Sequence, residues 1–292
     1  MKGFIAGVCK AGQRVHTRMG ECAMFEGTPL GFIIHNRNTS FSLDEATFNT
    51  EIKAGIVAIG IDRVTPLLNG LTDFQVSGGD VQTSQEGFGK ELPVKNNTKR
   101  VDYIINEGGI CLFRQLIKFN GRSVRIIPVD KNRVAYGTVA NLGGTDKFRG
   151  FAATLWSTRR DNTGTQAGAI IFSVFYDAEY ENEEADMAAI ALTETYEGLT
   201  GVILKRTGTG TAKFVIACSG DDLTSTYGTT LEDPTIYRNP AGGNPTTVVL
   251  NPTSDFLTFT PAAASYTILD AVTLKTAGIE GYEGEEEYVD LT

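Results

Sequence analysis

Short apolar stretches rich in β-branched residues and bounded by glycine recur along this chain, and they limit the fold that it can adopt. Gly150–Thr158 (GFAATLWST) and Gly168–Tyr176 (GAIIFSVFY) are two of them, joined by the polar connector Arg159–Gln166. Both have the length and composition of strands rather than of long helices. With 33 glycines and few runs of strong helix formers, the sequence predicts a mainly β protein.

Two segments predict helices. Ser42–Ala54 opens with Ser42 and Glu45 at the spacing of a capping box, and the apolar stretch Gly55–Val64 after it indicates a buried strand. The stronger helix lies near residues 109–119 and ends at Asn120-Gly121. Its apolar face consists of Ile110, Leu112, Phe113, Leu116, Ile117 and Phe119.

Two further segments predict strands or extended loops. Leu71–Val94 is broken by glycines and favours a long hairpin or an extended loop. Ser123–Val129 indicates a strand, with Pro128 placing it at a sheet edge or at a strand end.

A domain boundary is expected near Glu197-Gly198. Beyond it, turns rich in Gly, Pro, Asn and Asp separate several short strands. The expected strands are Gly201–Lys205, Lys213–Cys218, Thr246–Leu250, Phe256–Thr260 and Tyr266–Leu274. We therefore expect a β-sandwich or barrel-like domain over residues 1–198 with one packed α-helix, and a small immunoglobulin-like β-sandwich over residues 199–292.

Charge and cysteine content restrict the class of protein. The net charge is −9, and residues 201–292 hold 5 basic and 12 acidic groups, a net of −7, which argues against non-specific nucleic-acid binding. Four widely spaced cysteines form no C-x-x-C pair, so free thiols in a reducing cytosol are expected. No apolar stretch is long enough for a secretory signal or a membrane span, so no membrane partner is expected.

Catalytic and cofactor motifs are missing from the sequence. His16 and His35 stand among arginines and asparagine and predict surface or interface histidines, and no nucleophile elbow or Walker loop accompanies them. The sequence therefore favours a non-enzymatic protein with no catalytic residues, cofactor or metal site.

The run Asp177–Asp186 (DAEYENEEAD) contains six acidic residues and no base. A solvated edge explains it, and a charge-lined channel wall is the functional alternative. The six acids are Asp177, Glu179, Glu181, Glu183, Glu184 and Asp186.

Three stretches together resemble major tail tube proteins, or related virion structural proteins, of phages and prophages of the Bacteroidetes type. They are Arg63–Gly89, Gly168–Asn182 and Gly278–Leu291. The resemblance implies a virion protein that is made in the bacterial cytoplasm and self-assembles into homohexameric rings. The rings stack as a tail tube, bind other virion proteins and let DNA pass. The six acids would then line the lumen and repel the duplex.

Other functions remain open on the sequence. A capsid decoration or head–tail connector protein fits the same pattern. A carbohydrate-binding surface module is a different class, for which Tyr227, Tyr237 and Tyr282 are candidate stacking residues, whereas Trp156 lies in an expected core strand. A hydrolase with an unrecognised site is the fourth alternative.

Overall fold

The computed structural model describes residues 7–9, 27–78, 81–86, 90–96, 98–163, 167–177, 186–251, 253, 255–261, 265–285 and 287–292. These residues form a mainly β protein, as predicted. The chain divides into two compact units, and each is described by itself. Unit 1 comprises Met1–Ile56 and Gly60–Glu197, and unit 2 comprises Val57–Ile59 and Gly198–Thr292.

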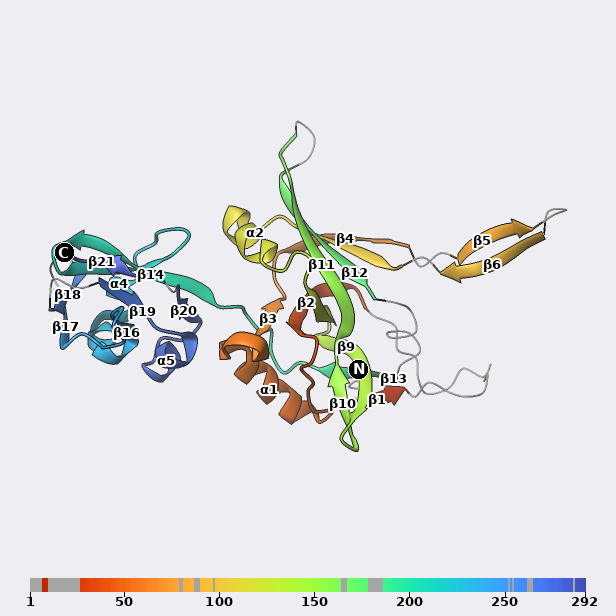
Figure 1. Ribbon diagram of the computed structural model, residues 1–292, viewed down its shortest axis with the longest axis horizontal. Helices are drawn as coiled ribbons and strands as arrows, with labels where there is room; N and C mark the ends of the chain where they lie inside the picture. Colours follow the sequence, from red (N-terminus) through yellow and green to blue (C-terminus); the bar gives the residue numbers. More distant parts are fainter. Residues whose placement is uncertain are drawn as a thin grey trace. The chain divides into compact units, whose positions relative to one another are not determined.

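The described strands of unit 1 form an 11-stranded sheet and a separate two-stranded hairpin (Figure 1). The main path of the large sheet runs β1-β13-β9-β8-β11-β12-β7-β4; β10 pairs with β9, and β2 pairs with β3 and β8. Its strands are β1 (Gly7–Cys9), β2 (Pro29–Asn36), β3 (Val64–Leu67), β4 (Leu71–Ser77), β7 (Arg100–Ile105), β8 (Ser123–Asp130), β9 (Val134–Leu142), β10 (Thr145–Arg149), β11 (Phe151–Arg160), β12 (Ala169–Tyr176) and β13 (Asp186–Ala191).

Strands β2 and β8 are buried on both faces, which explains their continuous apolar runs. Phe32 and Ile126 enter the main core, while the intervening Ile33 and Ile127 face the other way and are also fully buried. Pro128 pairs with Phe32 inside the sheet, so the prediction of an edge strand is wrong. Along its other side β8 pairs with β11 up to Ile126 and with β9 at Val129, and Pro128 lies where the partner changes.

The first helix, α1 (Glu45–Val57), begins and ends three residues later than the predicted Ser42–Ala54. Asp44, rather than Ser42, caps it, because the Asp44 carboxylate accepts the Thr47 N–H at 2.9 Å. Phe48, Ile52 and Ile56 recur every four residues and are buried, so the helix continues through Gly55. The predicted strand Gly55–Val64 is therefore wrong: a 3₁₀ turn, η1 (Gly60–Asp62), follows the helix, and β3 begins only at Val64.

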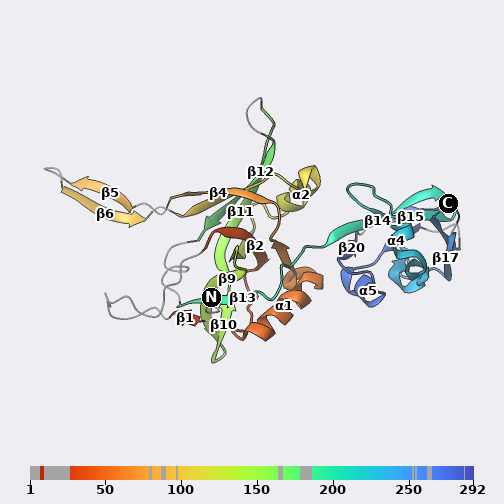
Figure 2. The same ribbon diagram turned by 180° about the vertical axis from the view of Figure 1, so that it is seen from behind.

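The second helix, α2 (Gly109–Ile117), confirms the prediction for residues 109–119. It packs on β11 and β12, as both Figure 1 and Figure 2 show. Leu116 is buried, and Leu112, Phe113 and Phe119 pack against the same core, but Ile110 and Ile117 are 45% and 41% exposed. Two helices, not one, therefore pack against the described sheet of unit 1.

The segment Leu71–Val94 contains hairpin strands, as predicted. β4 pairs with β7, and β5 (Val81–Glu86) pairs with β6 (Lys90–Asn96). Among the described strands, β5 and β6 pair only with each other. The predicted strand pair around Arg159–Gln166 is also confirmed, since β11 and β12 are antiparallel from Ala153 to Arg160.

Gly31 allows the close approach of β2 to β3, and its replacement is expected to destabilise unit 1. A Cβ at this position would clash with the Leu67 carbonyl oxygen and lie 2.7 Å from the Leu68 Cα, both backbone atoms. We expect Gly31→Ala to lower the free energy of unfolding by about 1–3 kcal/mol. Urea denaturation checks this, with Gly143→Ala as a control. Gly143 has open space around it and shows only the backbone strain of its positive φ. Equal losses in the two variants would contradict the steric explanation.

Unit 2 is a small β unit of two sheets around one core. Its five-stranded sheet has the order β17-β18-β15-β14-β20, and its three-stranded sheet the order β16-β19-β21. Phe214 and Phe259 from the first sheet pack with Tyr237 and Tyr266 from the second. The strands are β14 (Thr200–Gly208), β15 (Thr211–Ile216), β16 (Tyr237–Arg238), β17 (Thr247–Asn251), β18 (Phe256–Thr260), β19 (Ser265–Ile268), β20 (Tyr282–Gly284) and β21 (Val289–Asp290).

Unit 2 also contains short helices, which the sequence did not predict. They are α4 (Thr224–Tyr227), η2 (Gly228–Glu232), η3 (Pro234–Ile236) and α5 (Ala271–Thr276). The expected strand Tyr266–Leu274 ends at Ile268, because the Asp270 carboxylate accepts the Thr273 N–H at 3.0 Å and starts α5. In addition, β20 pairs with β14 in parallel.

Cys111 and Cys218 are both disulfide-bonded. The prediction of free thiols is therefore wrong for these two residues. The wide spacing of the four cysteines did not indicate this, because separation along a chain does not limit which cysteines can form disulfides.

Candidate assembly surface

The structure describes only the two ends of the predicted acidic run. Asp177 follows β12, where its N–H donates to the Ala152 carbonyl at 2.9 Å and its carboxylate pairs with Arg37 at 3.0 Å. Asp186 begins β13 and pairs in register with Val139 of β9. Glu179, Glu181, Glu183 and Glu184 lie outside the described residues. The sheet thus anchors both ends of the run, and Arg37 offsets the charge of Asp177.

Strand β4 lies at one end of the 11-stranded path and pairs on one side only among the described strands. Six of its seven residues, from Thr72 to Ser77, are exposed. Lysine, proline or short length commonly protects an edge strand from pairing with other chains. β4 contains neither lysine nor proline, and it is longer than a typical strand of about 5–6 residues. It is therefore a candidate for pairing with another chain.

Two apolar side chains stand on one face of β4. Phe74 pairs with Tyr103 of β7, and Val76 pairs with Val101. Tyr103 and Val101 belong to the buried core, whereas Phe74 is 38% exposed and Val76 is 56% exposed. Because paired residues in a sheet point to the same face, the apolar face of the sheet continues past the core into solvent.

Asp73 restrains this edge. Its carboxylate accepts the N–H of Phe74 at 2.8 Å, so the side chain already occupies one backbone donor of the strand. A charged side chain on an edge strand is also a common protection against uncontrolled pairing. β4 thus combines an apolar face with one acidic residue, Asp73, that restricts pairing at this edge.

The sheet face opposite α2 carries a row of polar and aromatic side chains. Trp156 pairs with Ser173, Ser173 with Asp102, and Asp102 with Gln75, so the row crosses four strands. Trp156 does lie in a core strand, but its side chain is 50% exposed and so stands outside the core. The alternation of Phe151, Ala153 and Leu155, which are buried, places Trp156 on the outer face, and counting by twos along the sequence could have found it.

Arg100 contacts three side chains on the same face. Its Nε donates to the Asp102 carboxylate at 2.7 Å, and its Nη2 donates to the Ser173 hydroxyl at 3.2 Å. The guanidinium also lies 5.0 Å from the Phe175 ring centre. Exposed tryptophan and arginine are enriched in the energetically important parts of protein interfaces. This face is therefore a second candidate surface for a partner.

His35 is not the surface or interface histidine that the sequence predicted. It is 2% exposed, its Nε2 accepts the Gly150 N–H at 3.2 Å, and its Nδ1 lies 2.9 Å from the Asn36 carbonyl oxygen. Burial, helped by the positive charges of Arg125 and Arg149, lowers its pKa to about 3. The imidazole is therefore neutral, with its proton on Nδ1, and its role is structural. His16 lies outside the described residues.

The tyrosines proposed for sugar stacking are mostly unavailable. Tyr237 is fully buried, and its hydroxyl donates to the Leu231 carbonyl at 2.9 Å. Tyr227 and Tyr282 are half-buried and contact each other edge-to-face at 5.7 Å. Burial and the hydrogen bond with Tyr282 raise the pKa of Tyr227 to about 12. These rings are packed rather than displayed.

The described residues hold neither a metal cluster nor a membrane-spanning helix. There, no three His, Cys, Asp or Glu side chains gather closely enough to hold a metal ion. Within the same ranges, no helix has the length and apolarity needed to cross a bilayer.

Comparison of the chain with protein-family models finds no match, and comparison with curated proteins finds none either.

Proposed function

We propose that this chain is a virion structural protein that self-assembles into rings, and that the rings stack as a phage tail tube through which DNA passes. The observation that carries the proposal is the β4 edge, which is long, apolar on one face and paired on one side only among the described strands. The three stretches that resemble tail tube proteins add to it.

A joint through β4 would link copies head to tail. The edge strand of one copy would continue its sheet on a different edge of the next copy, so the contact is heterologous. Repeating such a contact produces a closed ring when the rotation between copies closes, and an open filament when it does not. The homohexamer is the ring implied by the resemblance.

In this proposal the acidic run Asp177–Asp186 lines the lumen. Carboxylates there would repel the phosphates of a passing duplex and prevent the multiple contacts that lysines would make. Asp177 contributes less than the others, because Arg37 pairs with it. Unit 1 would then be the sandwich or barrel-like tube domain, and unit 2 an immunoglobulin-like sandwich on the outside of the particle.

The same experiments distinguish the alternative functions. A capsid decoration or head–tail connector protein would also assemble but with a different geometry. A carbohydrate-binding module would stay monomeric, and the packed tyrosines of unit 2 give it little support.

The test combines electron microscopy of the purified protein with light scattering. We expect rings or hollow tubes with a bore wide enough for a duplex. Replacing the apolar face of β4 in the double variant Phe74→Lys/Val76→Lys is expected to raise the protein concentration needed for assembly about thirtyfold, because burying the new charges costs about 2 kcal/mol per joint.

The matched control changes two other exposed apolar side chains to lysine, Leu142 and Val249, which are 42% and 54% exposed. It adds the same charge and is expected to assemble like the unmodified chain. Circular dichroism and thermal melting should show that both variants keep the fold. Normal assembly of the β4 variant would exclude the β4 joint, and an unmodified chain that stays monomeric at high concentration would favour the sugar-binding alternative.

A further inference from the structure

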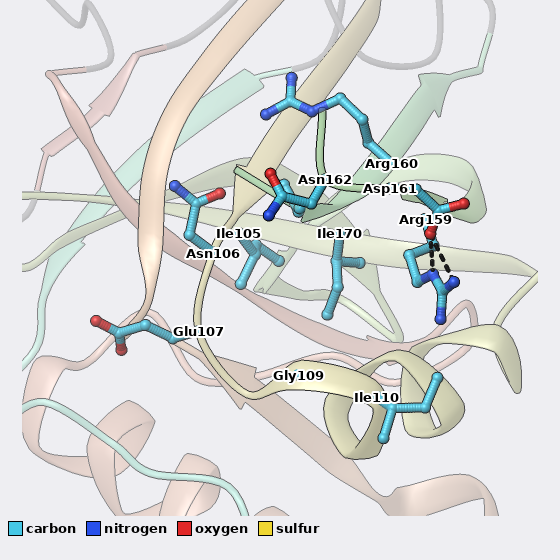
Figure 3. Close-up of a pocket in the computed structure, with 12 residues that line it drawn as sticks. Ile105, Asn106, Glu107, Gly109, Ile110, Arg159, Arg160, Asp161, Asn162 and Ile170 are labelled. Carbon is cyan, nitrogen blue, oxygen red and sulfur yellow. Dashed lines mark hydrogen bonds and ion pairs between the residues drawn. The ribbon is translucent and has the colours of Figure 1, made fainter. Parts of the chain in front are cut away.

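A pocket of about 240 Å³ opens in unit 1 where β7, β11 and β12 meet the first turn of α2 (Figure 3). Ile105, Ile110 and Ile170 face this space and form its apolar floor. Ile110, like Ile117, lies on α2 outside the core, and it remains 45% exposed. Pockets for small-molecule ligands are typically larger, about 300–1,000 Å³, so this one fits a protein side chain better than a cofactor.

The rim above the floor is polar and contains two arginines and two acids, which differ in how they are paired. Arg159 pairs with Asp161, their charged groups being 2.5 Å apart, so these two residues largely neutralise each other. Arg160 has no such acid: its Nη2 reaches only the Ala167 carbonyl at 3.5 Å, and its Nε is buried without a hydrogen-bond partner among the described residues. An anionic group entering the pocket would therefore find an available guanidinium.

Two further features of the rim agree with that charge. The first turn of α2 borders the pocket, and Gly108 at its N-cap provides no side-chain acceptor for the N–H groups there. Glu107 also borders the pocket, but one of its carboxylate oxygens lies beside Gly70, and Figure 3 shows the group turned away from the isoleucines. The pocket thus suits an apolar side chain next to a carboxylate.

An exposed apolar side chain next to a carboxylate occurs at η1. Ile61 is 74% exposed, the highest value among the large apolar side chains that the structure describes, and the exposed Asp62 follows it directly. The turn is held by the Arg63 N–H, which donates to the Gly60 carbonyl at 3.3 Å, and Gly60 itself has open space around it. Ile61 and Asp62 therefore protrude on a short, hydrogen-bonded turn.

We propose that Ile61 and Asp62 of one copy dock into the pocket of a second copy, with Ile61 on the isoleucine floor and the Asp62 carboxylate on Arg160. The inference rests on the proposed self-assembly and adds a second head-to-tail contact to the β4 joint. Its two halves pair an apolar side chain with an apolar floor and a carboxylate with a guanidinium, and both belong to unit 1. An apolar side chain that enters a pocket on the next copy is a heterologous contact, which rings require.

The first test compares Ile61→Ser with Ile59→Ser by light scattering and electron microscopy. Ile59 is a close match, because it lies two residues away and is 63% exposed. We expect Ile61→Ser to raise the concentration needed for assembly roughly thirtyfold and Ile59→Ser to leave it unchanged, since loss of an anchor side chain weakens an interface most. Equal behaviour of the two variants would overturn the docking.

The second test exchanges the charges. Asp62→Arg and Arg160→Glu should each impair assembly, and the double exchange should restore it, because the ion pair is re-formed with opposite polarity. Glu280→Arg, an equal charge change at an exposed residue of unit 2, serves as the control for Asp62→Arg. Assembly of the unmodified chain without rescue by the exchange would overturn the docking and leave the β4 joint intact. A chain that never assembles would overturn both.

Discussion

Replacing Asn49 by leucine is expected to destabilise unit 1 by about 3–5 kcal/mol, because several buried polar groups lose their partners together. The Asn49 amide donates to the Glu45 and Ala191 carbonyls at 2.8 and 3.0 Å. Its oxygen accepts the Thr193 N–H at 3.0 Å and the Tyr196 hydroxyl at 2.5 Å. One side chain thus joins α1 to the segment that follows β13.

Urea denaturation followed by circular dichroism measures the effect. Thr50→Ala is the control, since Thr50 is the next residue of α1, is exposed and makes one hydrogen bond to the Ala46 carbonyl. Its loss should cost no more than about 0.5 kcal/mol. A change below about 1 kcal/mol for Asn49→Leu would mean that water or a rearranged backbone satisfies the exposed partners, contrary to this account.

The stability of the protein is expected to fall steeply with acidification below pH 6.5, and His35 should be a major cause. Burial lowers the pKa of His35 from 6.5 to about 3 in the folded chain. Between these values the unfolded chain binds one proton more than the folded chain. The free energy of unfolding therefore decreases as the pH falls, by about 1.4 kcal/mol per pH unit, or about 3 kcal/mol between pH 6.5 and 4.

Unfolding free energies measured at several pH values test this, with His35→Gln as the comparison. Glutamine can accept the Gly150 N–H and donate to the Asn36 carbonyl, and it does not titrate. The profile of His35→Gln should lack a slope of about one proton over this range. The contribution of the carboxylates cancels in the difference between the two profiles, because both chains contain them. Parallel profiles would show that His35 charges within the fold.

Local patterns predicted those elements whose ends are marked by nearby residues. The β11–β12 pair follows from two apolar stretches around a polar connector, and α2 follows from its apolar spacing and the Asn120-Gly121 signal. Where the pattern allows two structures, tertiary packing decides. Gly55–Val64 resembles a strand, but Gly55 packs closely on Val64, and the buried Phe48, Ile52 and Ile56 continue the helix.

Most of the candidate surfaces could not be predicted from the sequence. Whether β4 lies at the end of a sheet depends on the order in which distant strands pair, and no local pattern contains that order. The pocket likewise needs β7, α2 and the β11–β12 connector to meet. Trp156 is the exception, since alternation along β11 predicts its outward face, whereas the buried His35 has no local sequence signal.

The hydrogen bond from the Phe74 N–H to the Asp73 carboxylate has a consequence for the rate at which assembly would begin. In the proposed assembly, a strand that joins β4 at this point would first have to displace a charged acceptor, so the first contact between two copies would be slower than contact with an edge that lacks this bond. Growth on an existing end gains the surrounding contacts at the same moment and overcomes that barrier more easily. In the proposed tube this bond would slow the start of assembly more than its continuation, so tube length would depend on where and when growth begins.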